Sequence, residues 1–293
     1  MKVEDVVIIG SGPAGIATAI QIKRYGMNPI ILEKNAIGGL LKNANFVENY
    51  PGFPDGISGL QLIELLKKHL VTAAVKVSYE NVLKLRLDDN LFRTKTNTRM
   101  ITSRKIVIAS GTKPKKIPNL SISDDVKNKI FYEIYPLFGI KDKKIIIIGA
   151  GDAAFDYALN LGKNNTVCIL NRGKTAKCLP LLWQRARKSS KISYYNETEI
   201  LKIINSSDER LLLECKTPKR ISKFYADYVI FAIGREPQLD FLSEDIKKNV
   251  KELERKKLLY FVGDVKNEIY RQTGICVGDG VKTAMKIYRD FEG

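Results

Sequence analysis

The chain is poor in the side chains that build metal centres and hydrolytic triads. Its only histidine is His69, so a site built from several histidines is excluded and a histidine-based catalytic triad is not expected. His69 lies in the helical pattern 64–71, and we interpret it as a surface or half-buried residue. The four cysteines show neither a CxxC motif nor the spacing of metal ligands. They are Cys168, Cys178, Cys215 and Cys276. We therefore predict no bound metal.

Long apolar runs are absent as well. A membrane-spanning helix needs about 20 consecutive apolar residues, and no run in the chain approaches that length. The N-terminal sequence MKVEDVVIIG carries two acidic residues and leads directly into an apolar strand, which is unlike a secretory signal. The sequence therefore predicts a cytoplasmic protein that does not associate with a membrane.

Acidic residues are outnumbered by basic ones. The chain has 49 Lys and Arg against 32 Asp and Glu, which gives a formal net charge of +17. The lysines form short groups along the chain, and no aromatic residues are interleaved with them, so nucleic acid is not the expected partner. Two interpretations remain. The charge is either a solvated lysine-rich surface or a basic face that steers an acidic protein or an anionic substrate.

Two segments repeat one pattern, and the first begins at the N-terminus. The apolar run 6–9 is followed by the turn 10–15, a helix to about residue 25 and a strand that ends in Glu33. In the G-x-G-x-x-G turn, Gly10 permits the tight bend, Gly12 lets the backbone approach a pyrophosphate, and Gly15 lets helix and strand pack closely. The helix N-terminus would face the phosphate charge, and Glu33 would accept hydrogen bonds from the ribose hydroxyls. This segment predicts a dinucleotide site.

The second segment has the same order, with a strand at 144–148, a turn at 149–154, a helix to about residue 161 and a strand at 166–170. Ala154 stands at the third glycine position, which is a permitted variant. The residues after the second strand, Asn171-Arg172-Gly173-Lys174, include no acid. Arg172 and Lys174 would attract a 2′-phosphate that a carboxylate would repel. The site therefore favours NADP over NAD, unless both cations are generic surface residues.

The duplicated motif predicts the fold class. We expect an α/β protein with two Rossmann-type, three-layer dinucleotide-binding domains, the second inserted into the first. Proline-containing stretches at 112–118 and 235–238 mark the crossings between domains. The predicted outer domain is discontinuous, with residues 1–115 and 238–293, and the inner domain comprises 116–237. The last helix is predicted at 277–291.

Together these motifs resemble the low-molecular-weight thioredoxin reductase family over nearly the whole chain. The matching stretches are Gly10–Gly15, Gly38–Leu40, Val47–Pro54, Ala109–Gly111, Phe231–Arg235, Gly263–Asp264 and Arg271–Thr273. The resemblance implies non-covalent FAD in the outer domain, NAD(P)H in the inner domain, and a homodimer. The residues it implies for FAD are Gly10, Gly12, Pro13, Ala14, Gly15, Glu33, Lys34, Gly39, Leu40, Asn49, Val82, Ala109, Ser110, Gly111, Gly263, Asp264, Arg271, Gln272 and Thr273. Those it implies for NAD(P) are Gly149, Gly151, Asp152, Ala153, Ala154, Arg172, Lys174, Gly234 and Arg235.

The sequence departs from that family at its redox centre. The family carries a CxxC shortly before the second dinucleotide strand, and an ungapped count from Gly149 places the two positions on Tyr132 and Tyr135. A relay through an enzyme disulfide therefore cannot run by its usual route. We predict that at least one of the two rings packs beside the flavin in some domain orientation. The alternative is that the linker has drifted and both tyrosines are ordinary core or surface residues.

The family's His-Arg-Arg pattern for NADP is also reduced, to Asn171-Arg172-Gly173, with Lys174 or Lys177 as possible replacements. Reduced flavin can release electrons singly, so four outlets remain open. They are a ferredoxin or flavodoxin, a small or thioredoxin-like disulfide, oxygen, and a flavin-binding subunit or sensor with little turnover. We favour the first outlet, because this chain resembles the ferredoxin reductases that lack the disulfide. Against it, those relatives carry a C-terminal extension over the flavin, whereas this sequence ends after its last helix.

Cys276 follows the stretch that the resemblance places near the flavin. A helix N-terminus can lower a thiol pKa and make the thiol reactive. A small buried side chain is the interpretation we favour.

Overall fold

The computed structural model describes residues 2–292. The chain forms two compact units. Unit 1 comprises Met1–Lys42, Val47–Lys113 and Glu236–Gly293, and unit 2 comprises Asn43–Phe46 and Pro114–Arg235. The sequence did not suggest that 43–46 groups with unit 2. The two long connections run as paired strands, because β7 (Thr112–Pro114) and β17 (Arg235–Pro237) form a two-stranded sheet.

Unit 1 is built on a seven-stranded sheet in the order β3-β2-β1-β6-β5-β4, with β18 also paired to β6. The strands are β1 (Val3–Ile9), β2 (Ile30–Leu32), β3 (Lys76–Ser78), β4 (Val82–Asp88), β5 (Leu91–Thr96), β6 (Met100–Ile108) and β18 (Leu259–Phe261). β1 lies parallel to β2 and β6, whereas β4 and β5 form an antiparallel hairpin. The first half of β6 pairs with β5 and its second half with β18.

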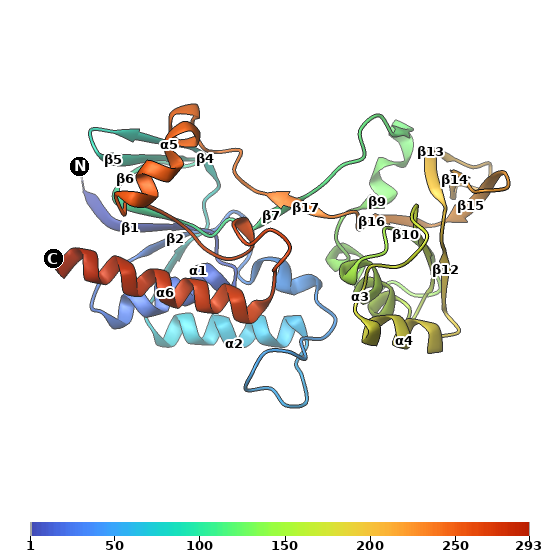
Figure 1. The fold of residues 1–293 in the computed structure, drawn as a ribbon, viewed down its shortest axis with the longest axis horizontal. Helices are drawn as coiled ribbons and strands as arrows, with labels where there is room; N and C mark the ends of the chain where they lie inside the picture. Colours follow the sequence, from blue (N-terminus) through green and yellow to red (C-terminus); the bar gives the residue numbers. More distant parts are fainter. Residues whose placement is uncertain (1, 293) are drawn as a thin grey trace. The chain divides into compact units, whose positions relative to one another are not determined.

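Helices cover both faces of this sheet. They are α1 (Pro13–Arg24), α2 (Gly59–Thr72), α5 (Glu244–Arg255) and α6 (Thr273–Glu292), with short 3-10 turns η1 (Gly39–Asn43) and η4 (Gly263–Val265). Val6 and Ile8 of β1 pack with residues of α1, α2 and α6, and Val7 and Ile9 pack with residues of α5 and the β4–β5 hairpin. Neighbouring strand residues point to opposite faces, so the apolar run at 6–9 supplies both cores. Figure 1 shows α6 lying along α1.

Helix α6 begins earlier than predicted, at Thr273 rather than residue 277. Gly274 and the β-branched Thr273 and Ile275 weaken the helical pattern in the sequence. In the structure, the first turn is closed by a hydrogen bond from Cys276 N to Gln272 O at 3.0 Å. Thr273 and Cys276 therefore lie in the first turn of the helix.

Unit 2 has three layers. The central sheet is parallel, in the order β12-β11-β10-β16-β9. Its strands are β9 (Ile130–Phe131), β10 (Lys144–Ile148), β11 (Thr166–Leu170), β12 (Ile192–Tyr195) and β16 (Tyr228–Phe231). Helices α3 (Asp152–Leu161) and α4 (Pro180–Lys188) pack on one face, and a second sheet packs on the other (Figure 1). That sheet contains β8 (Ser121–Ile122), β13 (Glu199–Asn205), β14 (Leu211–Lys216) and β15 (Ile221–Ala226). The turns η2 (Asp124–Lys129) and η3 (Tyr135–Leu137) complete the unit.

Within residues 2–292, no helix is both long enough and apolar enough to cross a membrane.

Candidate functional site

In unit 1 the first glycine-rich turn joins β1 to α1. Gly10 has φ +106, and a Cβ there would lie 2.3 Å from the carbonyl oxygen of Ala109, so only glycine fits between the two backbones. Gly12 is the N-cap of α1, with Pro13, Ala14 and Gly15 in its first turn. That turn contains no acidic residue. The positive end of the helix is therefore available to an anion.

Glu33 directly follows β2, one residue beyond the strand end, and lies beside this turn. Its carboxylate is buried and accepts hydrogen bonds from Ser11 N at 2.9 Å, Ser11 Oγ at 2.7 Å and Asn35 N at 2.9 Å. A carboxylate has about four acceptor positions, so Glu33 keeps capacity for a ribose hydroxyl. Lys34, the next residue, is exposed.

A second glycine pair closes over the turn. Gly38 N donates to Ser11 O at 2.9 Å, and a Cβ on Gly39 would lie 3.3 Å from the Cα of Gly12. Leu40 follows in η1. A Cβ on Gly12 would meet no atom within 4 Å. The backbone of Gly12 thus borders open space at the N-terminus of α1, which suits a pyrophosphate.

The C-terminal segment brings the remaining predicted FAD residues to unit 1. Gly263 and Asp264 form η4, and Thr273 begins α6. Asn49 Nδ2 donates to Gln272 Oε1 at 2.9 Å, so two predicted residues 223 positions apart are in contact. Among residues 2–292, the Nε atom of Arg271 is buried and has no hydrogen-bond partner. A buried guanidinium nitrogen of this kind fits a carbonyl oxygen of a flavin ring.

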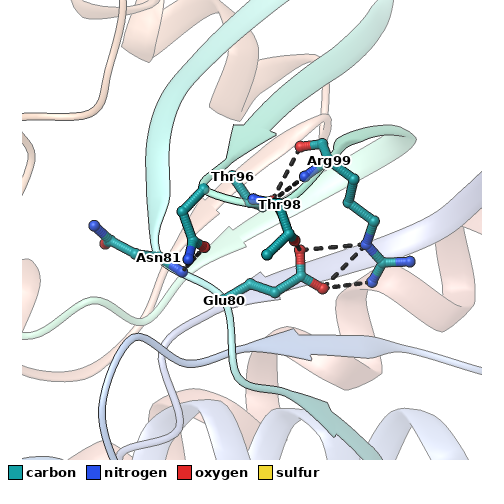
Figure 2. A network of polar contacts seen from close by, with 6 residues as sticks. Glu80, Asn81, Thr96, Thr98 and Arg99 are labelled. Carbon is teal, nitrogen blue, oxygen red and sulfur yellow. Dashed lines mark hydrogen bonds and ion pairs between the residues drawn. The ribbon is translucent and has the colours of Figure 1, made fainter.

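A polar network that the sequence did not indicate holds the loop between β3 and β4. Figure 2 shows the buried carboxylate of Glu80 between Arg99 and two threonines. Arg99 Nη2 donates to Oε1 at 2.6 Å, and Thr96 Oγ1 and Thr98 Oγ1 donate to Oε2 at 2.8 and 2.7 Å. Burial opposes ionisation, but these hydrogen bonds hold the pKa of Glu80 below its usual value. The loop they fix leads into Val82, the first residue of β4.

The loop between β3 and β4 also contacts the backbone of Glu33 beside the first glycine-rich turn. Ser78 O accepts hydrogen bonds from Glu33 N and Glu80 N, both at 2.9 Å. The Glu80 network therefore supports the backbone beside Glu33. Isolated Glu, Thr and Arg residues carry no sequence pattern that would have predicted it. The predicted crossing residues Ala109, Ser110 and Gly111 follow β6 at the same edge of the sheet, where Ala109 lies against Gly10. Ser110 Oγ donates to Gln238 O at 2.7 Å.

In unit 2 the second glycine-rich turn has the same construction. A Cβ on Gly149 would lie 2.3 Å from Ala232 O, whereas on Gly151 its nearest contact would be Lys177 O at 3.9 Å. Ala153 and Ala154 follow in the first turn of α3. Asp152 begins the helix, and its Oδ1 accepts a hydrogen bond from Leu179 N at 2.7 Å. Open space beside Gly151 at a helix N-terminus suits a dinucleotide phosphate.

The loop after β11 folds back over this turn. Asn171 is buried, and its Nδ2 donates to Thr175 O at 2.9 Å and Tyr194 Oη at 2.8 Å. Lys177 N donates to Ala150 O at 2.8 Å, which places Lys177 against the turn more directly than the sequence indicated. Arg172 and Lys174 are exposed. The charged groups of the loop are thus all cations, which fits a 2′-phosphate.

Of the two remaining predicted NAD(P) residues, Gly234 bends the chain at φ +106 and Arg235 begins β17. The guanidinium of Arg235 forms an ion pair with Glu133 at 3.3 Å. The same pair of charges surrounds the buried Tyr157, where burial is the main cause that raises the tyrosine pKa to about 12. Glu133 lies between the two tyrosines that replace the CxxC.

The two tyrosines have different surroundings in unit 2. The ring of Tyr132 stacks on Phe231 with centroids 5.5 Å apart and packs against the core between the two sheets. The ring of Tyr135 meets Phe138 edge-on at 5.5 Å and is 47% exposed. Tyr135 therefore exposes more surface to a further contact than the partly buried Tyr132 does.

All four cysteines are free thiols. Cys168 and Cys215 lie in the core between the two sheets of unit 2, where burial raises their pKa values to about 11 and about 12. Burial also raises the pKa of Cys178. Cys276 is buried, as favoured from the sequence; burial and then the charge of Asp264, which accepts its S–H at 3.2 Å, raise its pKa strongly. These raised pKa values disfavour the reactive thiolate form.

Comparison with known proteins identifies the family. Residues 4–280 match the family model described as "Pyridine nucleotide-disulphide oxidoreductase". The chain belongs to this family. It is a flavoprotein oxidoreductase of the thioredoxin reductase-like type.

Several relatives match over nearly their whole length. A "34.2 kDa protein in rubredoxin operon" from Clostridium pasteurianum is 26% identical, with 96% of this chain and 95% of the relative covered. The thioredoxin reductase of Mycoplasma genitalium is 27% identical, with 98% and 95% covered. The solved thioredoxin reductase of Lactococcus lactis has a TM-score of 0.86 at 24% identity, with 98% of each chain covered. The last comparison confirms the predicted fold class of two Rossmann-type domains.

Proposed function

We propose that this family member transfers electrons from NAD(P)H through FAD to an external acceptor without an enzyme disulfide. FAD would be held by the predicted residues of unit 1 and NAD(P)H by those of unit 2. Bound FAD supplies the chemistry, because it accepts a hydride and can release the electrons singly. The protein contributes binding, orientation and charge.

The state of the cysteines carries this proposal. A dithiol relay needs two neighbouring thiols with an accessible thiolate form. At the positions where the resemblance implies the family's pair, this chain has Tyr132 and Tyr135. The pKa of each of its four thiols is raised, with burial as the main cause. Electrons would therefore leave for the acceptor without passing through a protein sulfur atom.

Particular side chains would have defined tasks. Glu33 would hold the adenosine ribose of FAD, with its orientation fixed by Ser11 and Asn35. The unpartnered Nε of Arg271 would donate to an oxygen of the flavin ring. In unit 2, Arg172 and Lys174, together with the turn-bound Lys177, would neutralise a 2′-phosphate, so NADPH is the proposed donor.

For the acceptor we propose a ferredoxin, flavodoxin or similar one-electron protein. The formal net charge of +17 would speed encounter with an acidic partner. The relative named for a rubredoxin operon fits an electron-transfer setting.

A second candidate is direct reduction of an external disulfide at the flavin. It is favoured by the relatives that are thioredoxin reductases. In this reaction NADPH, one proton and a disulfide give NADP⁺ and two thiols.

We also propose that the chain is a homodimer, as the resemblance implies, which light scattering in solution tests.

Anaerobic stopped-flow measurement separates these outcomes. We expect rapid bleaching of the flavin by NADPH, and slower bleaching by NADH. The reduced protein is then mixed with ferredoxin, flavodoxin, a small disulfide or oxygen. Fast reoxidation by the one-electron proteins supports the first candidate, and fast reoxidation by the disulfide supports the second. A protein that neither nucleotide reduces is a sensor or subunit, which overturns the proposal.

A further inference from the structure

Unit 2 contains a long stretch without acidic residues. The whole chain has 32 Asp and Glu in 293 residues, yet none occurs between residues 157 and 196. The same stretch contains Lys163, Arg172, Lys174, Lys177, Arg185, Arg187, Lys188 and Lys191. In the structure it includes β11, the following loop and α4. The net positive charge of this stretch is therefore higher than the average composition predicts, because no acidic residue offsets its cations.

These cations are exposed and mostly unpaired. Elsewhere, surface lysines pair along helices, as Lys247 does with Glu244 and Lys256 with Glu252. Within the described residues, no carboxylate lies within ion-pair distance of the following exposed cations: Arg172, Lys174, Lys177, Arg187, Lys188 and Lys191. Their charges are not cancelled locally, so the field at this surface is available to an anionic partner.

Exposed apolar side chains and a pocket lie among these basic residues. Leu179 and Leu181, at the start of α4, are 52% and 47% exposed. Beside them lies a pocket of about 490 Å³, lined by Lys174, Thr175, Ala176, Cys178, Pro180, Trp183 and Tyr194. Trp183 is half-buried, edge-on to Tyr194 at 5.0 Å and to Phe155 at 5.5 Å.

The pocket is organised in advance. Its loop is fixed by hydrogen bonds from Asn171 Nδ2 to Thr175 O, from Lys177 N to Ala150 O and from Leu179 N to Asp152 Oδ1. A partner would therefore meet a preformed surface and would lose little ordering free energy on binding. An apolar centre that contains Trp and is surrounded by cations matches the composition of protein interfaces. Nucleic-acid interfaces are more polar.

We propose that the α4 surface, residues 178–191 with the pocket beside them, docks the acidic face of the protein that takes electrons from the enzyme, with an apolar side chain of that protein in the pocket. The inference rests on the proposed function and adds the place where the acceptor binds. Arg172, Lys174 and Lys177 are the cations proposed above for the dinucleotide, so Leu181, Arg187, Lys188 and Lys191 are the residues assigned to the partner.

Charge reversal tests the proposal. One variant combines Arg187→Glu, Lys188→Glu and Lys191→Glu. The matched control combines Lys248→Glu, Lys251→Glu and Arg255→Glu, which are exposed residues on and around α5. Both variants change the net charge equally, so any general charge effect appears in both. Dissociation constants for purified ferredoxin, flavodoxin and rubredoxin are measured by titration calorimetry at several salt concentrations.

We expect the α4 variant to weaken binding of at least one probe by about tenfold or more and to flatten its salt dependence. The control should change the same constant by no more than about twofold, and Leu181→Ala should weaken binding by about three- to tenfold with the salt dependence unchanged. Equal effects of the α4 variant and the control overturn the assignment of the surface.

Two further arms keep the result unambiguous. Absence of binding of all three probes to the wild-type protein at low salt overturns the docking proposal. NADPH-driven flavin reduction in the same preparation then shows that the proposed function stands independently. A single-stranded oligonucleotide is titrated in the same way. If wild type and control bind it and the α4 variant does not, while the three proteins bind all samples equally, the surface belongs to nucleic acid and the proposal is overturned.

Discussion

At the scale of residues, Gly10 and Gly12 lie two positions apart and have different requirements. Gly10 is needed for folding, because a Cβ would lie 2.3 Å from Ala109 O. Gly12 has an ordinary extended conformation and free space around its Cβ position. Packing within the protein therefore does not require glycine at position 12, and the open space leaves room for a ligand.

Gly12→Val should consequently fold but fail to retain FAD, because the side chain would occupy the position of the pyrophosphate. The far-UV spectrum should stay native while the flavin absorbance bands disappear from the purified protein. Gly10→Ala is the matched comparison, and it should lower the yield of folded protein. A yellow Gly12→Val protein would contradict the assignment of the first turn.

Arg172 tests the nucleotide preference. If it contacts the 2′-phosphate, Arg172→Ala should raise KM for NADPH by about tenfold or more and leave KM for NADH nearly unchanged, because a charge-assisted hydrogen bond contributes about 1.5–3 kcal/mol. Steady-state kinetics with an artificial acceptor gives both constants, and Arg187→Ala serves as the control. Equal increases for the two cofactors would show that Arg172 does not distinguish them.

Tyr135 carries the prediction about the missing CxxC. Because its ring is 47% exposed while Tyr132 stacks on Phe231, we expect Tyr135→Ala to alter the flavin spectrum, its fluorescence quenching or its reaction with oxygen. Tyr132→Phe should leave all three unchanged, since it keeps the stacking. An unchanged spectrum and oxygen rate in Tyr135→Ala would mean that the linker has only a structural role.

At the scale of elements, the two strand–turn–helix units were predictable because their glycines and apolar runs are local patterns. The first turn of α6 was not, since Thr273, Gly274 and Ile275 have weak helix propensity and the turn depends on tertiary contacts. The Glu80 network was also invisible, because Glu80 and Arg99 are 19 residues apart and meet only once β4, β5 and β6 have paired.

Glu80→Gln should destabilise the protein by about 1–3 kcal/mol, because it removes a buried charge that Arg99 and two threonines need as acceptor. The folded-state pKa of Glu80 is lowered, so its contribution is present above the usual value of 4.5 and is lost as the pH falls through the lower, folded-state value. The difference in Tm between wild type and variant should therefore be largest near neutral pH and should decrease as the pH is lowered.

The same variant should bind FAD more weakly, because the loop that Glu80 holds shares Ser78 O with the backbone of Glu33. Fluorescence titration of the FAD-free protein measures this affinity. Glu252→Gln, which changes an exposed pair on α5, is the control and should alter neither quantity. A pH-independent difference in Tm would exclude ionised Glu80 as its source.

At the scale of the whole molecule, the repeated motif predicted an inserted domain because it occurs once near each domain's start. Spatial neighbours that no motif marks were not predictable. Segment 43–46 groups with unit 2, Lys177 pairs with the second turn, and Trp183 meets Tyr194 beside a pocket. Each depends on contacts between segments distant in sequence, which composition and periodicity do not encode.

The central claim is that electrons pass from NADPH through FAD without any protein thiol. The most direct test follows both half-reactions by anaerobic stopped flow, reduction of the flavin by NADPH and its reoxidation by the acceptor, before and after exhaustive alkylation with iodoacetamide. Labelling is counted by mass spectrometry. We expect the same two rates in both samples, because Cys168, Cys215 and Cys276 are buried and Cys178 is assigned no role in turnover. Loss of reoxidation by the acceptor after alkylation would contradict the claim.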